Sequence, residues 1–332
     1  MRATIKDVSA RAGVSIKTVS RVLNDERYVG AATRERVRAA MAELRFRPSL
    51  AARSLAGRRS HQIALICDNP SPWYVFEMQS GMRDRCEAAG VRMIAQPYDR
   101  GTPDLGIVIE ALLDTTQADG VVLTPPASDR EDVLALLDAR GVPYVRVSPG
   151  VRPDSSPATM IDNEAAAHAM ASRLIALGHR RIGWVNGHPD YAASLQRAIG
   201  FARALEEAGI ARDLALQAPG LYDFASGEAA GRAMLALAEP PTAIFAANDE
   251  TAAGVLTVAH ARGVAVPARL SVAGFGDDAL ARFVWPPLTT IRQPVRTLAW
   301  NAADLLLAPD ADRAHRVVAW ELIERGSTGP AA

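Results

Sequence analysis

A stripe of cationic hydrogen-bond donors lies on one predicted helix near the start of the chain. Lys17 and Arg21 are four residues apart, a spacing that places both on one face of a helix. With Ile16 as zero and 100° per residue, this face covers about 0° to 140° and also holds Ser20. Apolar residues fall opposite, between about 240° and 340°. They are Val19, Val22 and Leu23. One face can therefore pack against a core while the other offers donors to a partner.

Two further helices are predicted around this one. Thr4 and Asp7 resemble a capping box, which begins a first helix at 5–12. Gly13 ends it, and Ser15 caps the helix that carries the basic stripe. A third helix begins near Thr33 and ends before Pro48, because proline disfavours helical backbone in its predecessor. Two helices joined by a tight glycine turn, the second with a basic face, are typical of a helix-turn-helix, whose second helix enters the major groove of DNA.

The charge of the chain is distributed unevenly. The 37 basic and 37 acidic residues give a formal net charge of zero. Residues 1–60 hold 14 basic and 5 acidic residues, a balance of +9, and the remaining residues hold 23 and 32, a balance of −9. A basic segment joined to an acidic body indicates a nucleic-acid-binding module attached to a domain that does not bind nucleic acid. The zero net charge is therefore a cancellation.

Length and composition restrict the class of protein. The chain has 332 residues, of which 49% are hydrophobic and 22% charged, which predicts a globular protein of two or three domains. The sequence contains no long apolar run and no apolar signal segment, so we expect no membrane association and a cytoplasmic, nucleoid-associated protein. Cys67 and Cys86 are too few for a disulfide framework and have no metal-ligand spacing, which predicts two buried thiols.

From residue 61 the pattern predicts an α/β fold. Short apolar runs alternate with longer helical segments, as in parallel sheets covered by helices on both faces. The predicted strands are 63–66, 91–94, 120–123, 143–147, 181–185, 242–246 and 270–274. Ligands of such sheets bind beyond the carboxyl ends of the strands, so the residues that follow each run are candidates for a site.

The basic segment resembles the N-terminus of the LacI/GalR family of bacterial transcription regulators. The matching motifs are TIKDV at 4–8, AGVS at 12–15, TVSRVLN at 18–24, TRERV at 33–37 and RSLAG at 53–57. The resemblance implies a helix-turn-helix domain at 1–47 and a hinge helix or linker at 48–60. It also implies double-stranded operator DNA as a partner.

The resemblance assigns contacts with DNA residue by residue. Ile16, Lys17 and Arg21 reach base edges, where the two cations donate to guanine O6 and N7 and Ile16 contacts a thymine methyl. The residues placed at phosphates, which position without specifying sequence, are Thr4, Ser15, Thr18, Ser20 and Asn24. The alternative for all of these residues is a solvated helix face.

The segment 49–56 is helix-prone but only about two turns long, shorter than the ~12 residues that an isolated helix needs in water. We therefore expect it to fold only on a partner. The resemblance implies that this hinge helix, with Arg53, forms as two subunits pair on the operator. It further implies that Leu55 wedges between base pairs of the minor groove. The alternative for Leu55 is an ordinary linker leucine.

The rest of the chain resembles the effector domain of the same family, which is related to periplasmic sugar-binding proteins. The matching motifs are LGHRRI at 177–182, RAIGF at 197–201, AND at 247–249 and PLTTI at 287–291. The implied effector domain is 61–325, with an N-lobe at about 61–161 and 293–322 and a C-lobe at about 162–292. A tail at 326–332 follows. Tetramers of this family usually carry a leucine heptad at the C-terminus, and the tail has none, so the resemblance implies a homodimer.

Seven residues are candidates for effector binding, and the same resemblance assigns five of them, all except Trp73 and Asp277. Asp68 and Tyr74 follow the first strand, and Trp73 beside them is the best pocket candidate among the tryptophans. Arg197 matches an arginine that holds ligand hydroxyls or a carboxylate, a role suited to its planar fork of donors. The other three candidates are Tyr222, which stacks on the ligand, the polar Asn248, and Asp277.

One position departs from the family pattern. Many members read Gly-Phe-Asp-Asp where this chain reads GFGDD at 274–278, so Gly276 replaces a carboxylate that grips a ligand hydroxyl. Either Asp277 substitutes for it or the ligand differs. Helix capping is an equal alternative for Asp277 and Asp278 and the favoured one for Asp249. Capping is also favoured for the pair at 162–163.

These observations predict a DNA-binding transcription regulator, a repressor of a carbohydrate-utilisation operon. It binds a pseudopalindromic operator as a homodimer and is controlled by a small sugar-like effector. No catalytic constellation, cofactor motif or metal-ligand spacing is present, and His179 is predicted to be a structural turn residue. The alternatives are a sugar-binding protein without DNA function and an enzyme on a doubly wound fold. The basic segment argues against the first, and the missing constellation argues against the second.

Overall fold

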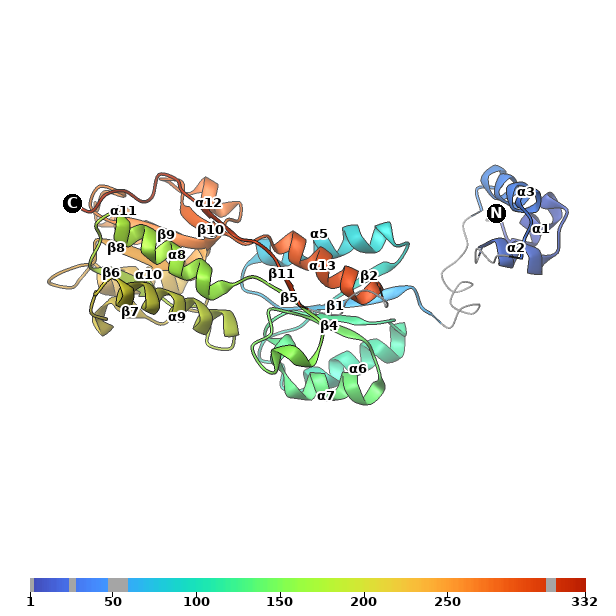
Figure 1. Cartoon of the computed structure of the whole chain (residues 1–332), viewed down its shortest axis with the longest axis horizontal. Coiled ribbons are helices and arrows are strands. Elements are labelled where there is room, and N and C mark those ends of the chain that lie inside the picture. The colour runs from blue at the N-terminus through green and yellow to red at the C-terminus, as the bar shows by residue number, and fades with distance from the viewer. Residues whose placement is uncertain (1–2, 24–27, 47–58, 309–314) are drawn as a thin grey trace. The chain divides into compact units, whose positions relative to one another are not determined.

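The chain divides into two units between His61 and Gln62. Figure 1 shows the computed structural model, which describes residues 3–23, 28–46, 59–308 and 315–332. Asn24, Arg53, Leu55 and the predicted hinge helix lie outside the described residues. The fold class is the predicted one, because an all-α unit precedes an α/β unit with two parallel sheets.

The first unit contains α1 (Ile5–Ala12), α2 (Ile16–Leu23) and α3 (Ala31–Glu43). The predicted capping box is present, since the backbone N–H of Thr4 donates to Oδ2 of Asp7 at 2.8 Å and the backbone N–H of Asp7 donates to Oγ1 of Thr4 at 3.4 Å. Oγ of Ser15 accepts the N–H of Thr18 at 3.1 Å, which confirms the predicted cap of α2. Both helices begin where their side-chain caps predict.

The third helix begins at Ala31, two residues before the predicted start near Thr33. Its N-cap is Gly30, whose backbone is extended and which makes no side-chain hydrogen bond. A glycine cap carries none of the oxygen-bearing side chains by which a helix start is recognised, so the sequence pattern missed it. The three helices pack around a small apolar core that includes Val8, Val19 and Val37, all fully buried.

The N-lobe is a parallel sheet in the order β11-β5-β4-β3-β1-β2. Its strands are β1 (Gln62–Cys67), β2 (Arg92–Pro97), β3 (Val121–Leu123), β4 (Tyr144–Val147), β5 (Ala158–Met160) and β11 (Arg316–Val317). In Figure 1, α5 (Pro72–Ala88) and α13 (Val295–Leu307) lie together on one face, and α6 (Leu105–Thr116) and α7 (Glu131–Arg140) lie on the other. Successive residues of β1 alternate between the two faces, so Ile63 and Leu65 pack with α13 while Ala64 and Ile66 pack with α6.

The C-lobe sheet has the order β12-β10-β9-β8-β6-β7 and is parallel except for the β12 edge. Its strands are β6 (Ile182–Val185), β7 (Gln217–Ala218), β8 (Ala243–Ala246), β9 (Ser271–Gly276), β10 (Thr289–Arg292) and β12 (Glu321–Ile323). One face is covered by α8 (Asn163–Ala176) and α9 (Ala192–Glu207), the other by α10 (Phe224–Met234) and α11 (Asp249–Ala261). The short α12 (Leu280–Phe283) follows β9, and single 3-10 turns occur at Ala127–Asp129, Pro153–Ser155 and Leu214–Leu216.

All seven predicted strands are present, and five others were missed. Four of these, β5, β7, β11 and β12, have only two or three residues, too few to form a recognisable apolar run. The fifth, β10, was missed because its sequence contains the polar residues Thr289 and Thr290. Both are fully buried in the structure. Their hydroxyls are satisfied by hydrogen bonds inside the lobe, so threonines here occupy core positions.

The last part of the chain corrects two predicted boundaries. The chain leaves the N-lobe after β11 and pairs β12 antiparallel with β10, so Glu321–Ile323 belongs to the C-lobe although the N-lobe was predicted to continue to residue 322. The predicted tail at 326–332 is packed, because Val272 N–H donates to the Ser327 carbonyl and Ala331 N–H to the Leu177 carbonyl, both at 2.8 Å. These backbone bonds attach the C-terminal segment to β9 and to the end of α8.

His179 lies beneath this C-terminal segment. Its ring nitrogens are 2.9 Å from Oγ1 of Thr242 and 3.0 Å from both Oγ of Ser271 and the Gly329 carbonyl. Burial lowers the pKa of His179, so the ring is neutral at pH 7. The histidine joins the start of β6 to the C-terminus, which is the structural role predicted for it.

Both cysteines of the chain lie in the described part of the α/β unit. Cys67 and Cys86 are buried free thiols, and burial raises the pKa of each to about 11. Within the described ranges, no helix combines the length and apolar character needed to cross a bilayer. Among those same residues, no three His, Cys, Asp or Glu side chains are grouped so that they could hold a metal ion.

Candidate functional site

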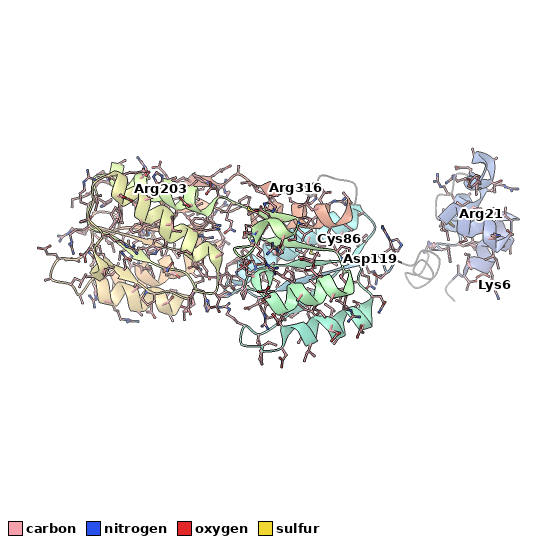
Figure 2. The ribbon with its side chains drawn as sticks, turned by 60° about the horizontal axis from the view of Figure 1, so that its bottom comes forward. Lys6, Arg21, Cys86, Asp119, Arg203 and Arg316 are labelled. Carbon is pink, nitrogen blue, oxygen red and sulfur yellow. The ribbon has the colours of Figure 1, made fainter. Side chains whose placement is uncertain are left out.

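The exposed face of α2 is the candidate DNA-binding surface. Val19 and Val22 are buried against the core, whereas Ile16, 44% exposed, and Lys17 face away from it. Arg21 lies one turn after Lys17 and is half-buried. Figure 2 shows Arg21 on this unit together with Lys6, which is exposed on α1. The structure thus separates the packing face of α2 from the predicted reading face as the helical spacing requires.

Two of the hydroxyl residues among the predicted phosphate contacts, Thr4 and Ser15, also cap helices. Thr4 caps α1 through Asp7, and Oγ of Ser15 lies 2.9 Å from Oγ1 of Thr18 while it caps α2. Their backbones lie at helix N-termini, where N–H groups and the helix dipole favour an anion such as a phosphate. Capping and phosphate contact are compatible uses of the same residues.

A cavity of about 350 Å³ lies in the α/β unit and is lined from both lobes. Six of the seven predicted effector residues line it: Trp73, Tyr74, Arg197, Tyr222, Asn248 and Asp277. Trp73 and Tyr74 lie at the N-terminus of α5, and the other four come from the C-lobe. Aromatic rings with a few convergent polar groups are the usual lining of a small-molecule site.

Arg197 is a buried cation of this lining, which also includes Arg282, Arg292 and Arg296. It lies on α9 and is 5% exposed, and its guanidinium carbon lies 3.6 Å from the Phe275 ring centroid. Nε donates to Oδ1 of Asn163 at 2.9 Å, and one terminal nitrogen donates to the Ala247 carbonyl at 2.7 Å. The other terminal nitrogen donates to Oε1 of Gln293 at 3.4 Å. Burial lowers the pKa of Arg197.

These bonds leave part of the guanidinium unsatisfied. The three acceptors of Arg197 are neutral, and within the described ranges no carboxylate forms an ion pair with it. A guanidinium carries five N–H donors, so about two remain without a protein acceptor. A buried cation without a counter-charge is costly, and a ligand oxygen or carboxylate would relieve that cost.

Tyr222 and Asn248 are linked to each other. Nδ2 of Asn248 donates to the Tyr222 carbonyl at 2.9 Å, and Oδ1 of Asn248 accepts the N–H of Thr251 at 3.0 Å. Asn248 is therefore the N-cap of α11. Tyr222 has a positive φ of 62°, its hydroxyl accepts a hydrogen bond from Ser194 at 2.8 Å, and its ring centroid lies 5.8 Å from the Arg197 guanidinium carbon. The cap holds the backbone that presents this ring.

Capping was expected at Asp249, and the structure corrects this. Asp249 is the first residue of α11 and 1% exposed, with Oδ1 accepting from Oγ1 of Thr290 at 2.6 Å and Oδ2 accepting from the N–H of Asp278 at 3.1 Å. The helix is capped one residue earlier, so the Asp249 side chain is free to turn inward. Capping at Asp162 is confirmed, since Oδ1 accepts the N–H of Ala165 at 2.8 Å.

The residues around Gly276 explain its departure from the family pattern. Gly276 has a φ of 143°, and a Cβ built on it would lie 3.1 Å from Oδ2 of Asp249. A carboxylate here would point at the buried Asp249. Asp277 lines the cavity, but its carboxylate is only 1% exposed and pairs with Arg325 and, at 2.7 Å, with Nε of Arg292. Neither aspartate is the N-cap of α12, which is Ala279, although Oδ1 of Asp278 accepts the N–H of Leu280 at 3.0 Å.

Asp68 is the one predicted effector residue that does not line the cavity. Its carboxylate accepts from Nε of Arg100 at 3.1 Å, so it is engaged in an ion pair on the N-lobe. The neighbouring Asn69 lines the cavity instead. The expectation that ligands bind beyond the carboxyl ends of strands therefore located the correct turn. The residue that lines the cavity is Asn69, one position after the predicted Asp68.

Several lining residues were missed by the sequence reading. They include Asn69, Ser148, Tyr191, Phe275 and Gln293. The first two follow the carboxyl ends of β1 and β4, so the rule for open α/β sheets could have found them. Gln293 follows β10, a strand that was not predicted. Tyr191 lies six residues after β6 ends, too far for that rule.

Comparisons with known proteins agree with this architecture. Residues 4–49 match the family described as bacterial regulatory proteins, lacI family, and residues 171–328 match the periplasmic binding protein-like domain. The HTH-type transcriptional repressor PurR of Vibrio atlanticus is 33% identical over 96% of each chain. The lac repressor dimer bound to operator and the anti-inducer ONPF has a TM-score of 0.83 and 28% identity, covering 99% of this chain and 100% of that chain. The CelR–cellobiose complex has a TM-score of 0.74 and 31% identity, covering 98% and 100%.

A helix-turn-helix unit joined to a two-lobed, periplasmic-binding-protein-like unit defines a DNA-binding transcription regulator rather than an enzyme. The chain belongs to the LacI family of bacterial regulatory proteins, with relatives that match it over nearly its full length.

Proposed function

We propose that this regulator is a repressor of a carbohydrate-utilisation operon, that it binds a pseudopalindromic operator as a homodimer, and that a small sugar-like effector controls it. The observation that carries the effector proposal is Arg197, a buried cation on the cavity wall with neutral acceptors for only part of its donors. Its planar fork suits neighbouring hydroxyls or a carboxylate.

The remaining cavity wall has the chemistry of a carbohydrate site. Trp73, Tyr74 and Tyr222 offer aromatic faces, while Asn69 and Gln293 offer amide groups that donate and accept. Sugars present both apolar C–H faces and hydroxyls, so this mixture can hold both. The lac repressor relative was solved with ONPF and with ONPG, and the CelR relative with cellobiose, which supports an effector of this class.

On the DNA side, we propose that Lys17 and Arg21 donate to guanine edges and Ile16 contacts a thymine methyl. Thr4, Ser15, Thr18, Ser20 and Asn24 bind phosphates. Leu55 is the minor-groove wedge and Arg53 accompanies it in the hinge. A dimer on a pseudopalindrome places two α2 helices in successive major grooves, and the relative solved as a dimer on its operator supports this arrangement.

Control by the effector follows from the two-lobed body. A sugar bound between the lobes favours the lobe arrangement to which it binds more tightly, and this shifts the equilibrium only by that differential affinity. The lobe arrangement decides whether two hinge segments can pair on DNA. The effector therefore acts on operator affinity without touching DNA.

The effector proposal is tested with the full chain and a panel of sugars that includes cellobiose, galactose and glucose. A ligand that binds the native state raises the melting temperature of the α/β unit. Trp73→Ala removes a 40%-exposed wall residue and should abolish the rise, whereas Phe76→Ala, on the same helix and outside the cavity, should retain it. A melting temperature unmoved by every sugar, or an equal effect of both variants, would contradict the proposal.

The DNA proposal is tested with the two lysines of the chain. Lys17→Ala should weaken binding to a duplex selected from a random pool by about 1–3 kcal/mol and relax its base preference. Lys6→Ala is the matched control, since Lys6 is exposed on α1 and should change affinity equally for all sequences. Affinity must fall steeply with salt.

Leu55→Ala should weaken operator binding and leave sugar binding intact. Absence of a bound duplex at any salt concentration contradicts the assignment.

A further inference from the structure

Asp68, Arg100 and Tyr191 form one connected contact between the lobes. Arg100 follows β2 of the N-lobe, and Tyr191 is the N-cap residue of α9 in the C-lobe. Nε of Arg100 donates to Oδ2 of Asp68 at 3.1 Å, and a terminal nitrogen donates to the Tyr191 hydroxyl at 3.1 Å. The Tyr191 hydroxyl in turn donates to the Asp68 carbonyl at 3.4 Å. We call these three residues the clasp.

Tyr191 joins the clasp to the effector cavity. It is 4% exposed and lines the cavity, and its ring lies edge-on to Tyr222 with centroids 5.5 Å apart. Tyr222 in turn lies beside Arg197. The hydroxyl of Tyr191 points to the N-lobe partners while its ring belongs to the aromatic wall. The position of this ring therefore depends on the partners of its hydroxyl.

Arg100 and Asp68 contribute nothing directly to the cavity lining. Their side chains are 24% and 19% exposed, so the ion pair is partly shielded from solvent. The same end of α9 meets the N-lobe at a second point, because a Cβ on Gly150 would lie 2.1 Å from Cβ of Ala192. The lobes are in close contact here, and a hydrogen bond across the contact is exchanged for water when the lobes separate.

We propose that Arg100, held by Asp68, is a positioning residue for effector binding. It fixes Tyr191 of the opposite lobe, so that the aromatic wall is complete only while the lobes are clasped. This inference rests on the proposed function, since it deepens how the cavity recognises its effector. Arginine suits the task because its rigid fork can donate to a carboxylate and a hydroxyl at once, whereas lysine is a flexible point charge.

The experiment compares full-length variants by hydrogen exchange without added sugar. Arg100→Leu removes both donors, and Tyr191→Phe removes only the hydroxyl while keeping the ring. Arg85→Leu is the matched control, since Arg85 pairs with Asp304 at 2.7 Å, is 17% exposed and has its guanidinium carbon 5.6 Å from the Trp300 ring centroid, all within the N-lobe. The two arginines are matched in this respect, because the guanidinium carbon of Arg100 lies 5.3 Å from the Tyr191 ring centroid.

Amides at 188–194 should exchange about tenfold faster in Arg100→Leu and in Tyr191→Phe, the loss expected for a hydrogen bond to a charged group. Arg85→Leu should lower the melting temperature and leave exchange at 188–194 unchanged. If Arg100→Leu does not fold, Tyr191→Phe alone decides. Unchanged exchange at 188–194 in Tyr191→Phe, or an equal acceleration in Arg85→Leu, overturns the proposal.

A titration with cellobiose separates this inference from the proposed function. If the wild-type chain binds cellobiose, both clasp variants should bind it about tenfold more weakly through faster dissociation, and Arg85→Leu should bind it normally. Normal binding by both clasp variants overturns the positioning role. If the wild-type chain binds neither cellobiose nor any other sugar of the panel, the proposed function fails, and the exchange measurement still decides whether the clasp holds the lobes.

Discussion

Two buried arginines in the α/β unit have different surroundings. Arg146 on β4 is 0% exposed and Arg197 on α9 is 5% exposed, and burial lowers the pKa of both guanidinium groups. Neither forms an ion pair with a carboxylate of the described residues. Each side chain therefore carries a desolvation cost. They differ in how many of their donors the protein itself satisfies.

Arg146 is surrounded by protein oxygens. Nε donates to Oγ of Ser156 at 2.7 Å, and one terminal nitrogen donates to the carbonyls of Val151 at 2.7 Å and Ser128 at 3.3 Å. The other terminal nitrogen reaches further oxygens. They are the carbonyls of Arg152 and Pro153 and the hydroxyl of Ser155. Six acceptors for five donors leave nothing for a ligand, so Arg146 organises the loop that follows β4.

Arg197 has three acceptors and a cavity in front of it. The comparison shows that burial and missing counter-charge alone do not identify a binding arginine. The distinguishing property is an incomplete set of acceptors on the side that faces a cavity. A fully satisfied arginine serves the fold, and a partly satisfied one is available to a ligand.

The largest effect on stability is expected at Arg146. Arg146→Met keeps an unbranched stem but orphans several carbonyls of the loop after β4, so the free energy of unfolding should fall by about 4 kcal/mol. Urea unfolding followed by tryptophan fluorescence measures this, because all five tryptophans lie in the α/β unit. Sugar affinity of the folded fraction should fall less than in Arg197→Met, because Ser148 is the residue of this loop that lines the cavity. A loss below about 1 kcal/mol would remove the contrast between the two arginines.

The converse result is expected at Arg197. Arg197→Met should weaken binding of the sugar that most stabilises the wild-type chain by about 100-fold, because it removes the buried charged donors that Arg197 adds to the cavity wall. Its cost in stability should be smaller than that of Arg146→Met, since removing a buried unpaired charge relieves a desolvation penalty. Calorimetric titration and urea unfolding of the same samples measure both. An unfolding loss equal to that of Arg146→Met with unchanged affinity would make Arg197 a structural residue.

This contrast could not be read from the sequence. Arg197 was found through a family resemblance around RAIGF, whereas Arg146 lies in an apolar strand pattern that gives no reason for a buried cation. Its six acceptors come from residues 128 and 151–156, which are brought together only by the turn after β4. Hydrogen-bond satisfaction depends on such non-local arrangement, and local patterns do not encode it.

Local signals predicted two helix starts of the first unit and seven of the twelve strands of the described residues. Thr4 and Ser15 fixed two helix starts because side-chain caps act within three residues, while the glycine cap of α3 left no such signal. In the cavity, strand ends pointed to the correct turns, but could not distinguish Asp68, which faces Arg100, from Asn69, which lines the cavity. Which of two adjacent side chains enters a cavity is decided by packing between the lobes.

A smaller effect on the free energy of unfolding is expected from pH, through the ionisation of Asp249. Asp249 is the carboxylate whose charge acts on Arg197 and opposes the lowering of its pKa by burial. Burial, with the nearby Asp278, raises the pKa of Asp249 from 3.8 to about 7. Between these values the folded state holds a proton that the unfolded state lacks, so stability is lost as pH rises through this window. The slope for one proton is about 1.4 kcal/mol per pH unit.

Asp249→Asn removes this share of the pH dependence. Relative to the wild-type chain, the variant should gain unfolding free energy as the pH is raised from 5 to 7, measured by urea unfolding in matched buffers. Glu250, whose pKa burial also raises to about 7, keeps its own contribution in both proteins. The difference between the two proteins therefore reports Asp249 alone. A difference that stays constant over this range would show that Asp249 is ionised throughout and balances the Arg197 charge.

The smallest expected effect tests whether the hydrogen bonds of Arg146 contribute about equally to the free energy of unfolding. Ser156→Ala deletes the acceptor of Nε, and five of the six acceptors remain, so the free energy of unfolding should fall by only about 1 kcal/mol. Sugar affinity should be unaffected, because the loop after β4 would keep its carbonyl contacts with the guanidinium. A loss as large as that of Arg146→Met would instead mean that one hydrogen bond governs the orientation of the whole side chain. The additional acceptors of Arg146 would then add little to its stability. The number of acceptors would not distinguish a structural arginine such as Arg146 from the ligand-binding arginine proposed at Arg197.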